Sequence, residues 1–429
     1  MGMLNYYLRL SVKSLKRYPI LYGLVVLTLA LGVGIFTANL VILTTMASDP
    51  IPEKSAQLFH ISINTWPDET NDPVTDILRY ADGIALKQGE FHDRMVMHYL
   101  AAAYIRDAAA ENLTRFSGAI RASSHQFLTM MSAPFKYGNT FTDDNSYDVV
   151  LGASMNDTLF GGDNSVGKTL EVDGKLFTIV GVLDEWPLRP MFYHMSEGFE
   201  SRGTEDLFMP IETALDNNFF ARVIMVAVDN FDTMAETRDS TVYYLQGWVE
   251  LTSESQKKRF IKTMQEYSQS LKDAGQFPNE MITDLHDVNE WLAHNEVIDN
   301  RVVAFAIAAG LFLVVCVFNA SSLLLTRYSA TSFDTAIKRA LGMSKQQLLL
   351  QCLVEGTVIG MVSGFISMLL AYGFLRLTVL MLPSLKDVAA IDIDMLLFGL
   401  ILALITALLS SLYPVAHSRS IAISTELKG

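Results

Sequence analysis

One segment of this chain matches a nucleotide-binding pattern. Gly162-Asp-Asn-Ser-Val-Gly167-Lys168-Thr169 satisfies G-x-x-x-x-G-K-[ST], the signature of a phosphate-binding loop. In such a loop the Lys-Thr step begins a helix, whose backbone N–H groups and dipole bind the phosphates. Here the next residues are Leu170-Glu-Val-Asp-Gly174, which predict a strand that ends in a tight turn. We therefore interpret the segment as a false match and expect no nucleotide to bind there.

Nucleophiles and metal-ligating residues show no catalytic spacing. Gly152-Ala-Ser154-Met-Asn lacks the second glycine of a nucleophile elbow. The eight histidines show no H-x-x-x-H or H-E-x-x-H spacing, so His92 and His98 are expected to be structural. We accordingly expect no catalytic residue, no metal site and no cofactor in this chain, and we do not expect an enzyme.

A short charged segment between two long apolar runs is the strongest functional candidate. It reads Ser332-Phe-Asp334-Thr-Ala-Ile337-Lys338-Arg339-Ala340-Leu341-Gly342-Met-Ser344. Ile337 and Leu341 recur at helical spacing while the charges face elsewhere, which predicts an amphipathic helix on a membrane surface. Gly342 is expected to end that helix and Ser344 to cap the next one.

Four apolar runs must position this segment. Residues 20–46 contain no charge and are too long for the apolar core of a signal peptide, so they predict an uncleaved first membrane span. We expect the following order: a cytoplasmic amphipathic segment 1–19, span 20–46, a large domain 47–300, span 301–326, the charged segment 327–347, span 348–382, a loop 383–394, span 395–412 and a tail 413–429.

Charge is unevenly distributed between these parts. The large domain carries about 40 of the 46 acidic residues and about 19 of the 32 basic residues, so the rest of the chain is basic. Lys and Arg are in excess at the N-terminus, in the charged segment and at the C-terminus, which places all three in the cytoplasm by the positive-inside rule. An acidic domain on a basic membrane portion argues against a nucleic-acid partner.

The large domain has the pattern of an α+β fold outside the cytoplasm. Residues 147–151 and 176–183 predict strands, the second entered through a turn at Asp173-Gly174. Asp72-Pro73 predicts the start of a helix with Val74, Ile77, Leu78 and Ala81 on one face. Ser253 and Gln256 form a capping box that predicts another helix.

Two features inside the spans have open interpretations. Gly356, Gly360 and Gly364 recur every four residues, as do Gly399, Ala403, Ala407 and Ser411, which predicts close helix contacts, either within one bundle or between subunits. Glu355 is an intramembrane carboxylate. Such a residue is functional by default, but near the cytoplasmic end it could also reach the membrane surface or bond to the charged segment.

The motifs together resemble the MacB/FtsX/LolC-E type of ABC transporter permease. Asp334-Thr-Ala-Ile-Lys-Arg-Ala-Leu-Gly342 is similar to the E-[IL]-x-[IV]-[RK]-R-A-L-G segment between spans two and three of that family, with Asp334 in place of Glu. Val150-Leu-Gly152, Leu159-Phe-Gly161, Val166-Gly-Lys-Thr-Leu170 and Phe177-Thr-Ile-Val-Gly-Val-Leu183 resemble its periplasmic core domain. The C-terminal Ala422-Ile-Ser-Thr-Glu-Leu427-Lys departs from the family's D-P-x-x-A-L-R ending.

The resemblance implies a four-span inner-membrane permease, with both termini cytoplasmic and a MacB-like α+β periplasmic domain between spans one and two. It implies that residues 334 and 337–342 form a coupling helix, moved by a separate cytoplasmic ATPase dimer that binds the ATP. The implied partners are a second permease, a periplasmic adaptor and an outer-membrane channel, and the implied function is efflux of a peptide, antibiotic or other amphiphile. Regulation of a cell-wall hydrolase and lipoprotein release are alternatives, and Lys338 and Arg339 could instead bind anionic lipid.

Overall fold

The computed structural model describes residues 2–65, 76–89, 92–111, 114–186, 188–194, 205–222, 225–227, 229–276, 282–298, 300–381 and 393–420. The chain divides into two compact units. Residues 1–47 and 298–429 form the membrane unit, and residues 48–297 form the inserted domain.

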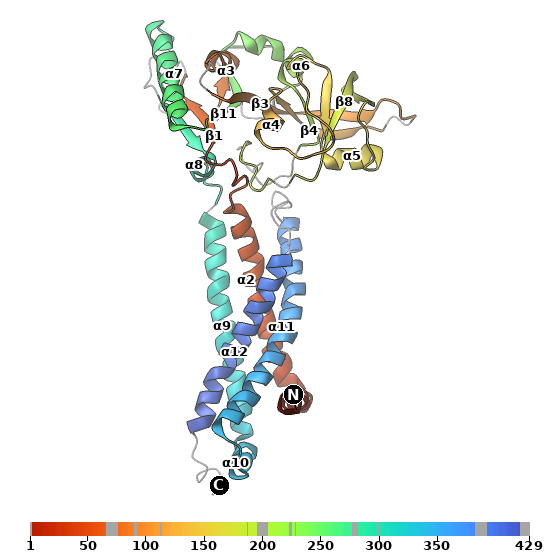
Figure 1. Cartoon of the computed structure of the whole chain (residues 1–429). Coiled ribbons are helices and arrows are strands. Elements are labelled where there is room, and N and C mark those ends of the chain that lie inside the picture. Colours follow the sequence, from red (N-terminus) through yellow and green to blue (C-terminus); the bar gives the residue numbers. More distant parts are fainter. Residues whose placement is uncertain are drawn as a thin grey trace. The chain divides into compact units, whose positions relative to one another are not determined.

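The described part of the membrane unit is helical (Figure 1). Four of its helices are long and apolar enough to cross a membrane, within Pro19–Met46, Asn300–Ala330, Gln346–Met381 and Ile393–Leu412. This confirms the prediction of four spans with the large domain between the first and the second. The helices are α1 (Gly2–Arg17), α2 (Pro19–Met46), α9 (Asn300–Ala330), α10 (Ser332–Ala340), α11 (Lys345–Met381) and α12 (Ile393–Ser420).

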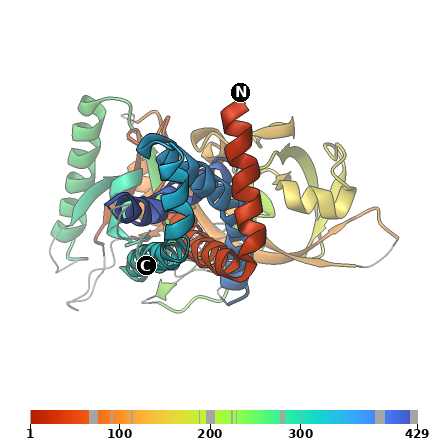
Figure 2. The ribbon, with the colours of Figure 1, turned by 90° about the horizontal axis from the view of Figure 1, so that it is seen from below.

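Helix α1 is amphipathic and lies across the end of the bundle. Figure 1 shows it almost end-on and Figure 2 shows it lengthwise, so it does not run along the spans. Tyr7 and Ser11 are buried on one side, whereas Arg9, Lys13 and Lys16 are exposed. A helix with one apolar side and one basic side is suited to the plane of a membrane surface.

Local sequence determines where α10 ends and α11 begins. Gly342 has φ +101°, a conformation that other residues avoid because of their Cβ atom, and it follows the last turn of α10. Ser344 then caps α11, since its Oγ accepts from the backbone N–H of Gln347 at 3.2 Å and the Gln347 Oε1 accepts from the Ser344 N–H at 2.9 Å.

One helix start differs from the sequence expectation. Residues 327–330 belong to α9, so the charged helix starts only at Ser332. The fourth candidate span ends at Leu412, as expected, while helix α12 itself continues through Pro414 to Ser420. A proline removes one hydrogen bond and bends a helix, but it need not end it.

The inserted domain is built on one mixed, mostly antiparallel sheet. Its strand order is β12-β1-β11-β3-β4-β9-β6-β8-β5, and the pairs β4–β9 and β6–β8 are parallel. The strands are β1 (Leu58–Ile63), β2 (Leu78–Arg79), β3 (Arg94–Asp107), β4 (Phe116–Ser123), β5 (Phe135–Gly138), β6 (Asp148–Leu151), β7 (Thr169–Val172), β8 (Lys175–Leu183), β9 (Leu207–Pro210), β10 (Val226–Ala227), β11 (Val242–Glu250) and β12 (Thr283–Asp287). The helices are α3 (Tyr80–Lys87), α4 (Phe127–Met130), α5 (Ala153–Phe160), α6 (Ile211–Asp216), η1 (Met234–Arg238), α7 (Glu254–Asp273) and α8 (Val288–His294).

The structure confirms most of the expected elements and corrects one. Strands β6 and β8 and the Ser253–Gln256 capping box of α7 are as predicted. The helix expected from Asp72-Pro73 is wrong at Leu78, which lies in β2 opposite Leu245 of β11, and α3 begins only at Tyr80. Asp72, Pro73 and Val74 lie outside the described residues. Pairing with β11 outweighs the local helical pattern at Leu78.

The two faces of the sheet are packed differently. One face supports the main apolar core, which includes Ile61, Met97, Ile120 and Leu245. The alternate residues of the same strands carry polar and aromatic side chains, because successive residues of a strand point to opposite faces. His60, His98, Arg121 and Trp248 are all buried on this second face.

A buried arginine organises the second face. Arg121 Nε donates to Glu205 Oε1 at 2.9 Å, and Arg121 Nη1 lies 3.2 Å from Nδ1 of both His98 and His194. The Tyr193 hydroxyl donates to the other Glu205 oxygen at 2.8 Å. Since every charge in this group has an opposite charge or a hydrogen-bond partner, the interior of the sheet tolerates it.

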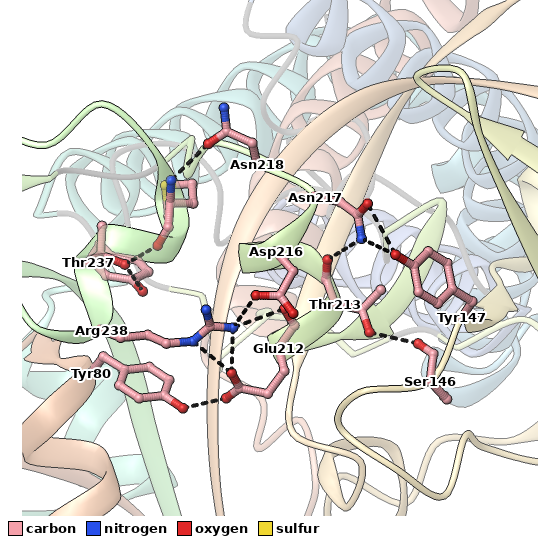
Figure 3. A network of polar contacts seen from close by, with 12 residues as sticks. Tyr80, Ser146, Tyr147, Glu212, Thr213, Asp216, Asn217, Asn218, Thr237 and Arg238 are labelled. Atoms are coloured by element: carbon pink, nitrogen blue, oxygen red, sulfur yellow. Dashed lines mark hydrogen bonds and ion pairs between the residues drawn. The ribbon is translucent and has the colours of Figure 1, made fainter.

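A second polar network fastens α6 to the surrounding elements (Figure 3). Arg238 Nη2 lies 2.8 Å from Glu212 Oε2 and 2.8 Å from Asp216 Oδ1, and the Tyr80 hydroxyl donates to Glu212 Oε1 at 2.6 Å. Burial and the hydrogen bond to Glu212 raise the pKa of Tyr80, so its proton stays in place at neutral pH. Thr213 and Asn217 bond to Ser146 and Tyr147 on the other side (Figure 3).

The buried histidines make the stability of the inserted domain depend on pH. Burial lowers the pKa of His98 well below its ordinary value, and the charge of Arg121 adds to this effect. Burial likewise lowers the pKa of His60, whose ring stacks on Trp291 at 3.5 Å between centroids, with smaller contributions from His286 and His294. Below the unperturbed pKa of about 6.5, these histidines are therefore protonated in the unfolded chain but stay neutral in the native domain. The free energy of unfolding of the domain accordingly decreases as pH falls through this range.

We predict that the urea midpoint of the inserted domain is lower at about pH 5 than at about pH 7.5, and that His60→Phe weakens this dependence. Tryptophan fluorescence of the full-length protein measures it, because all four tryptophans lie between residues 66 and 291. A midpoint that stays constant or rises on acidification would contradict the assignment.

Candidate functional site

Helix α10 presents an apolar side to solvent. Phe333, Ile337 and Leu341 follow at intervals of four residues, and their exposed fractions are 54%, 39% and 82%. Ala336 is 5% exposed, so the helix is anchored on its opposite side. Residues spaced by four share one side of a helix, and three exposed large apolar side chains in one row are typical of a surface that binds a partner.

The charged residues of α10 have separate environments. Asp334 Oδ2 lies 3.8 Å from Arg17 Nη1 of α1, in an exposed ion pair. Lys338 lines a cavity that α10 shares with α1, α9 and α11. Arg339 is half-buried, and Ala340, the last residue of α10, is exposed.

Glu355 is fully enclosed in the membrane unit and bonded to several helices. It is 1% exposed, and its Oε1 lies 3.3 Å from Nη2 of Arg327 on α9. The Tyr22 hydroxyl of α2 donates to Oε1, and the Tyr328 hydroxyl of α9 donates to Oε2 at 3.4 Å. Ser14 of α1 donates to Oε1 at 3.2 Å. The carboxylate of α11 therefore joins α1, α2 and α9.

Arg327 is the partner that makes this burial tolerable. Besides Glu355 it donates to Ser14 Oγ at 2.8 Å, and its guanidinium lies 4.5 Å from the centroid of the Tyr328 ring. A lone carboxylate or guanidinium inside a membrane is costly, whereas a paired and hydrogen-bonded one is tolerated. The pair therefore tends to hold the four helices together at this end of the bundle.

Sequence reasoning identified only half of this group. Glu355 stood out as the one carboxylate in an apolar run, but Arg327 was assigned to the charged segment, as one of its cytoplasmic bases. The sequence does not show how α9 is rotated about its axis. In the structure this rotation buries Arg327, although Arg327 follows the end of the apolar run. Ser14, Tyr22 and Tyr328 carried no signal of their own.

The glycines of α11 face α12. An added Cβ would lie 2.8 Å from Ser411 Oγ at Gly356, 2.9 Å from the Leu404 Cα at Gly360 and 2.6 Å from Leu400 Cδ1 at Gly364. Ala403 and Ala407 of α12 are also buried. The sequence left open whether these glycines pack within one bundle or between subunits. In the structure, α12 of the same chain is their packing partner.

The false phosphate-binding segment has a different structure from a nucleotide site. Strand β7 begins at Thr169, directly after Gly167 and Lys168, so no helix starts there. The Lys168 ammonium lies over the Phe160 ring, 4.4 Å from its centroid. Among the residues that the structure describes, no group of His, Cys, Asp and Glu is arranged to hold a metal ion.

Comparisons with known proteins agree with this architecture. Residues 22–242 match the MacB-like periplasmic core domain, and residues 306–423 match the FtsX-like permease C-terminal domain. The chain therefore belongs to the family of MacB/FtsX-type ABC transporter permeases, multi-pass membrane proteins with a periplasmic α+β domain between the first two spans.

Individual relatives are more distant. Over 131 residues the chain is 30% identical to the macrolide export ATP-binding/permease protein MacB of Wolinella succinogenes. The matched stretch covers 28% of this chain and only 19% of that protein. The periplasmic region of MacB from Actinobacillus actinomycetemcomitans is 14% identical, with a TM-score of 0.37 over 58% of this chain and 96% of that one. The extracellular domain of the transporter YknZ from Gram-positive bacteria is also 14% identical, with a TM-score of 0.35 over 53% of this chain and 98% of that one.

We predict that Glu355→Ala destabilises the membrane unit by about 3–5 kcal/mol, because it leaves the Arg327 charge buried and unpaired. Asp334→Ala, which breaks only the exposed pair with Arg17, is the matched control and is expected to change stability little. Thermal unfolding read by a thiol-reactive fluorophore measures both, since Cys316 and Cys352 are buried in this unit. Equal effects of the two substitutions would contradict the role of the pair.

We also predict that Gly360→Ala destabilises the bundle by about 1–3 kcal/mol, because the new methyl group meets the backbone of α12. Gly373→Ala on the same helix has open space around its Cβ and is expected to be neutral or slightly stabilising. The same thiol assay compares them. If Gly360→Ala were as stable as Gly373→Ala, the close approach of α11 and α12 would be wrong.

Proposed function

We propose that this chain is the permease subunit of a mechanotransmission-type ABC transporter. A separate cytoplasmic ATPase dimer binds and hydrolyses ATP, engages α10 and moves the spans, which in turn change the shape of the periplasmic domain. The observation that carries the proposal is the exposed apolar row of Phe333, Ile337 and Leu341 on a short helix anchored through Ala336. This row has the form of a helix that fills a groove on a partner.

The contacts around α10 support transmission of a force. Asp334 connects α10 to α1, and α1 contributes Ser14 to the group around Glu355 and Arg327. A displacement of α10 would therefore reach α2, α9 and α11 through packed and hydrogen-bonded atoms. Such contiguous, discretely packed elements shift between alternative arrangements and do not deform gradually.

The charge pattern and the domain size support the remaining parts of the proposal. The excess of Lys and Arg at both termini and around α10 supports a cytoplasmic location for all three and a periplasmic one for the inserted domain. A periplasmic domain of this size, residues 48–297, favours export over regulation of a cell-wall hydrolase. We propose efflux of a peptide, antibiotic or other amphiphile by a permease dimer, through a periplasmic adaptor and an outer-membrane channel.

We predict that Leu341→Asp weakens binding of the cognate ATPase about tenfold or more and abolishes stimulation of its turnover, because it places a charge at the most exposed side chain of the apolar row. Gln346→Asp adds the same charge at an exposed position on the first turn of α11 and is expected to leave both unchanged. The measurement is ATPase binding and turnover with the full-length permease in vesicles. Unaltered binding and turnover for Leu341→Asp would contradict the proposal.

A further inference from the structure

A cavity of about 390 Å³ lies between α1, α9, α10 and α11. This volume is within the range of small-molecule binding sites in proteins. Its walls come from the helix that lies across the end of the bundle and from the coupling helix, together with two spans. An occupant would therefore contact α10 and its neighbours at the same time.

The cavity is strongly basic. Lys13, Arg17, Arg327 and Lys338 line it, against the single acidic side chain of Asp334. Asp334 already pairs with Arg17, and Arg327 pairs with Glu355. Among the described residues Lys13 and Lys338 have no carboxylate partner, so two positive charges face the cavity unbalanced. An anion is the ligand that this arrangement favours.

Two buried polar atoms in the wall lack a hydrogen-bond partner among the described residues. They are Nε of Arg327, a donor, and Oε1 of Gln351, an acceptor, and both side chains are more than nine-tenths buried. Orphaned buried donors and acceptors are rare in native proteins and point to a missing ligand or water.

Apolar side chains also line the cavity, beside the polar ones of Ser14 and Thr331. Leu10, Ile337 and Leu348 contribute side chains to the same cavity, next to the bases. The combination of cations, apolar side chains and an amphipathic helix in the wall is typical of a site at the membrane–water interface. A soluble phosphate would use the bases but leave the apolar lining without a partner.

We propose that this cavity binds the headgroup of an anionic phospholipid. The phosphate oxygens lie near Lys13 and Lys338, with Arg327 and Gln351 in the same wall, and the apolar side chains contact the glycerol and the first acyl carbons. The lipid then connects α10 to α1, so the composition of the membrane tunes how firmly the coupling helix is held. This inference goes beyond the proposed function, because it holds whether or not an ATPase docks on α10.

The test uses the delipidated full-length protein in a neutral detergent, with phosphatidylglycerol as the probe and native mass spectrometry to count retained lipid. Lys13→Gln and Lys338→Gln are each expected to weaken phosphatidylglycerol binding about fivefold, the effect of one basic side chain on an anionic lipid. Lys16→Gln is the matched control, since Lys16 lies on the same helix, is exposed and does not line the cavity. It should bind like the wild type.

Phosphatidylcholine, which lacks net charge and a headgroup hydroxyl, and glycerol 3-phosphate, which lacks acyl chains, complete the experiment. We expect phosphatidylcholine to bind more weakly than phosphatidylglycerol and glycerol 3-phosphate not to displace the lipid. Equal binding of phosphatidylglycerol to the wild type, Lys13→Gln and Lys338→Gln would overturn the proposal. Displacement of the lipid by glycerol 3-phosphate would also overturn it, because the cavity would then be a site for a soluble phosphate ester.

Discussion

The buried ion pair between Glu355 and Arg327 is the constraint on which the membrane unit depends. Neither charge could stay inside a membrane alone, so each requires the other, and their remaining hydrogen-bonding capacity requires Ser14, Tyr22 and Tyr328. These partners lie on α1, α2 and α9, while Glu355 lies on α11. Four helices are thereby held in one arrangement at the end of the bundle where α10 lies, by interactions that are strong only when all are made together.

Two kinds of packing hold α11. Glu355 makes polar contacts with specific geometry to α1, α2 and α9, whereas the glycines at positions 356, 360 and 364, which follow it directly, approach α12 through close backbone packing. Close packing resists compression, and a hydrogen-bonded charge pair resists separation. A helix with both is suited to move as a rigid element, which agrees with a proposed function in which α10 is displaced and the spans transmit the displacement.

The sequence predicted what depends on composition and periodicity. Four apolar runs, the inserted α+β domain and the amphipathic segment at Ile337 and Leu341 followed from patterns that burial in lipid and in a core imposes. It could not predict what depends on helix rotation and distant pairing. Arg327 was interpreted as one more cytoplasmic base, whereas its side chain points inward and pairs with Glu355. Leu78 was predicted to be helical, whereas it lies in a strand that pairs with β11. The arginine that organises the second face of the sheet, Arg121, also gave no signal, because its partners come from segments as distant as Glu205.

In the proposed mechanism, motion of α10 reaches the periplasmic domain through the Glu355–Arg327 pair. Pulsed electron paramagnetic resonance tests this with spin labels at the exposed positions Lys175→Cys of β8 and Lys262→Cys of α7, two elements toward opposite ends of the domain in Figure 1. In the complex with the ATPase, addition of ATP should shift the distance distribution between the labels. Glu355→Gln should abolish the shift while ATPase binding and hydrolysis continue. A full shift in Glu355→Gln would contradict the account.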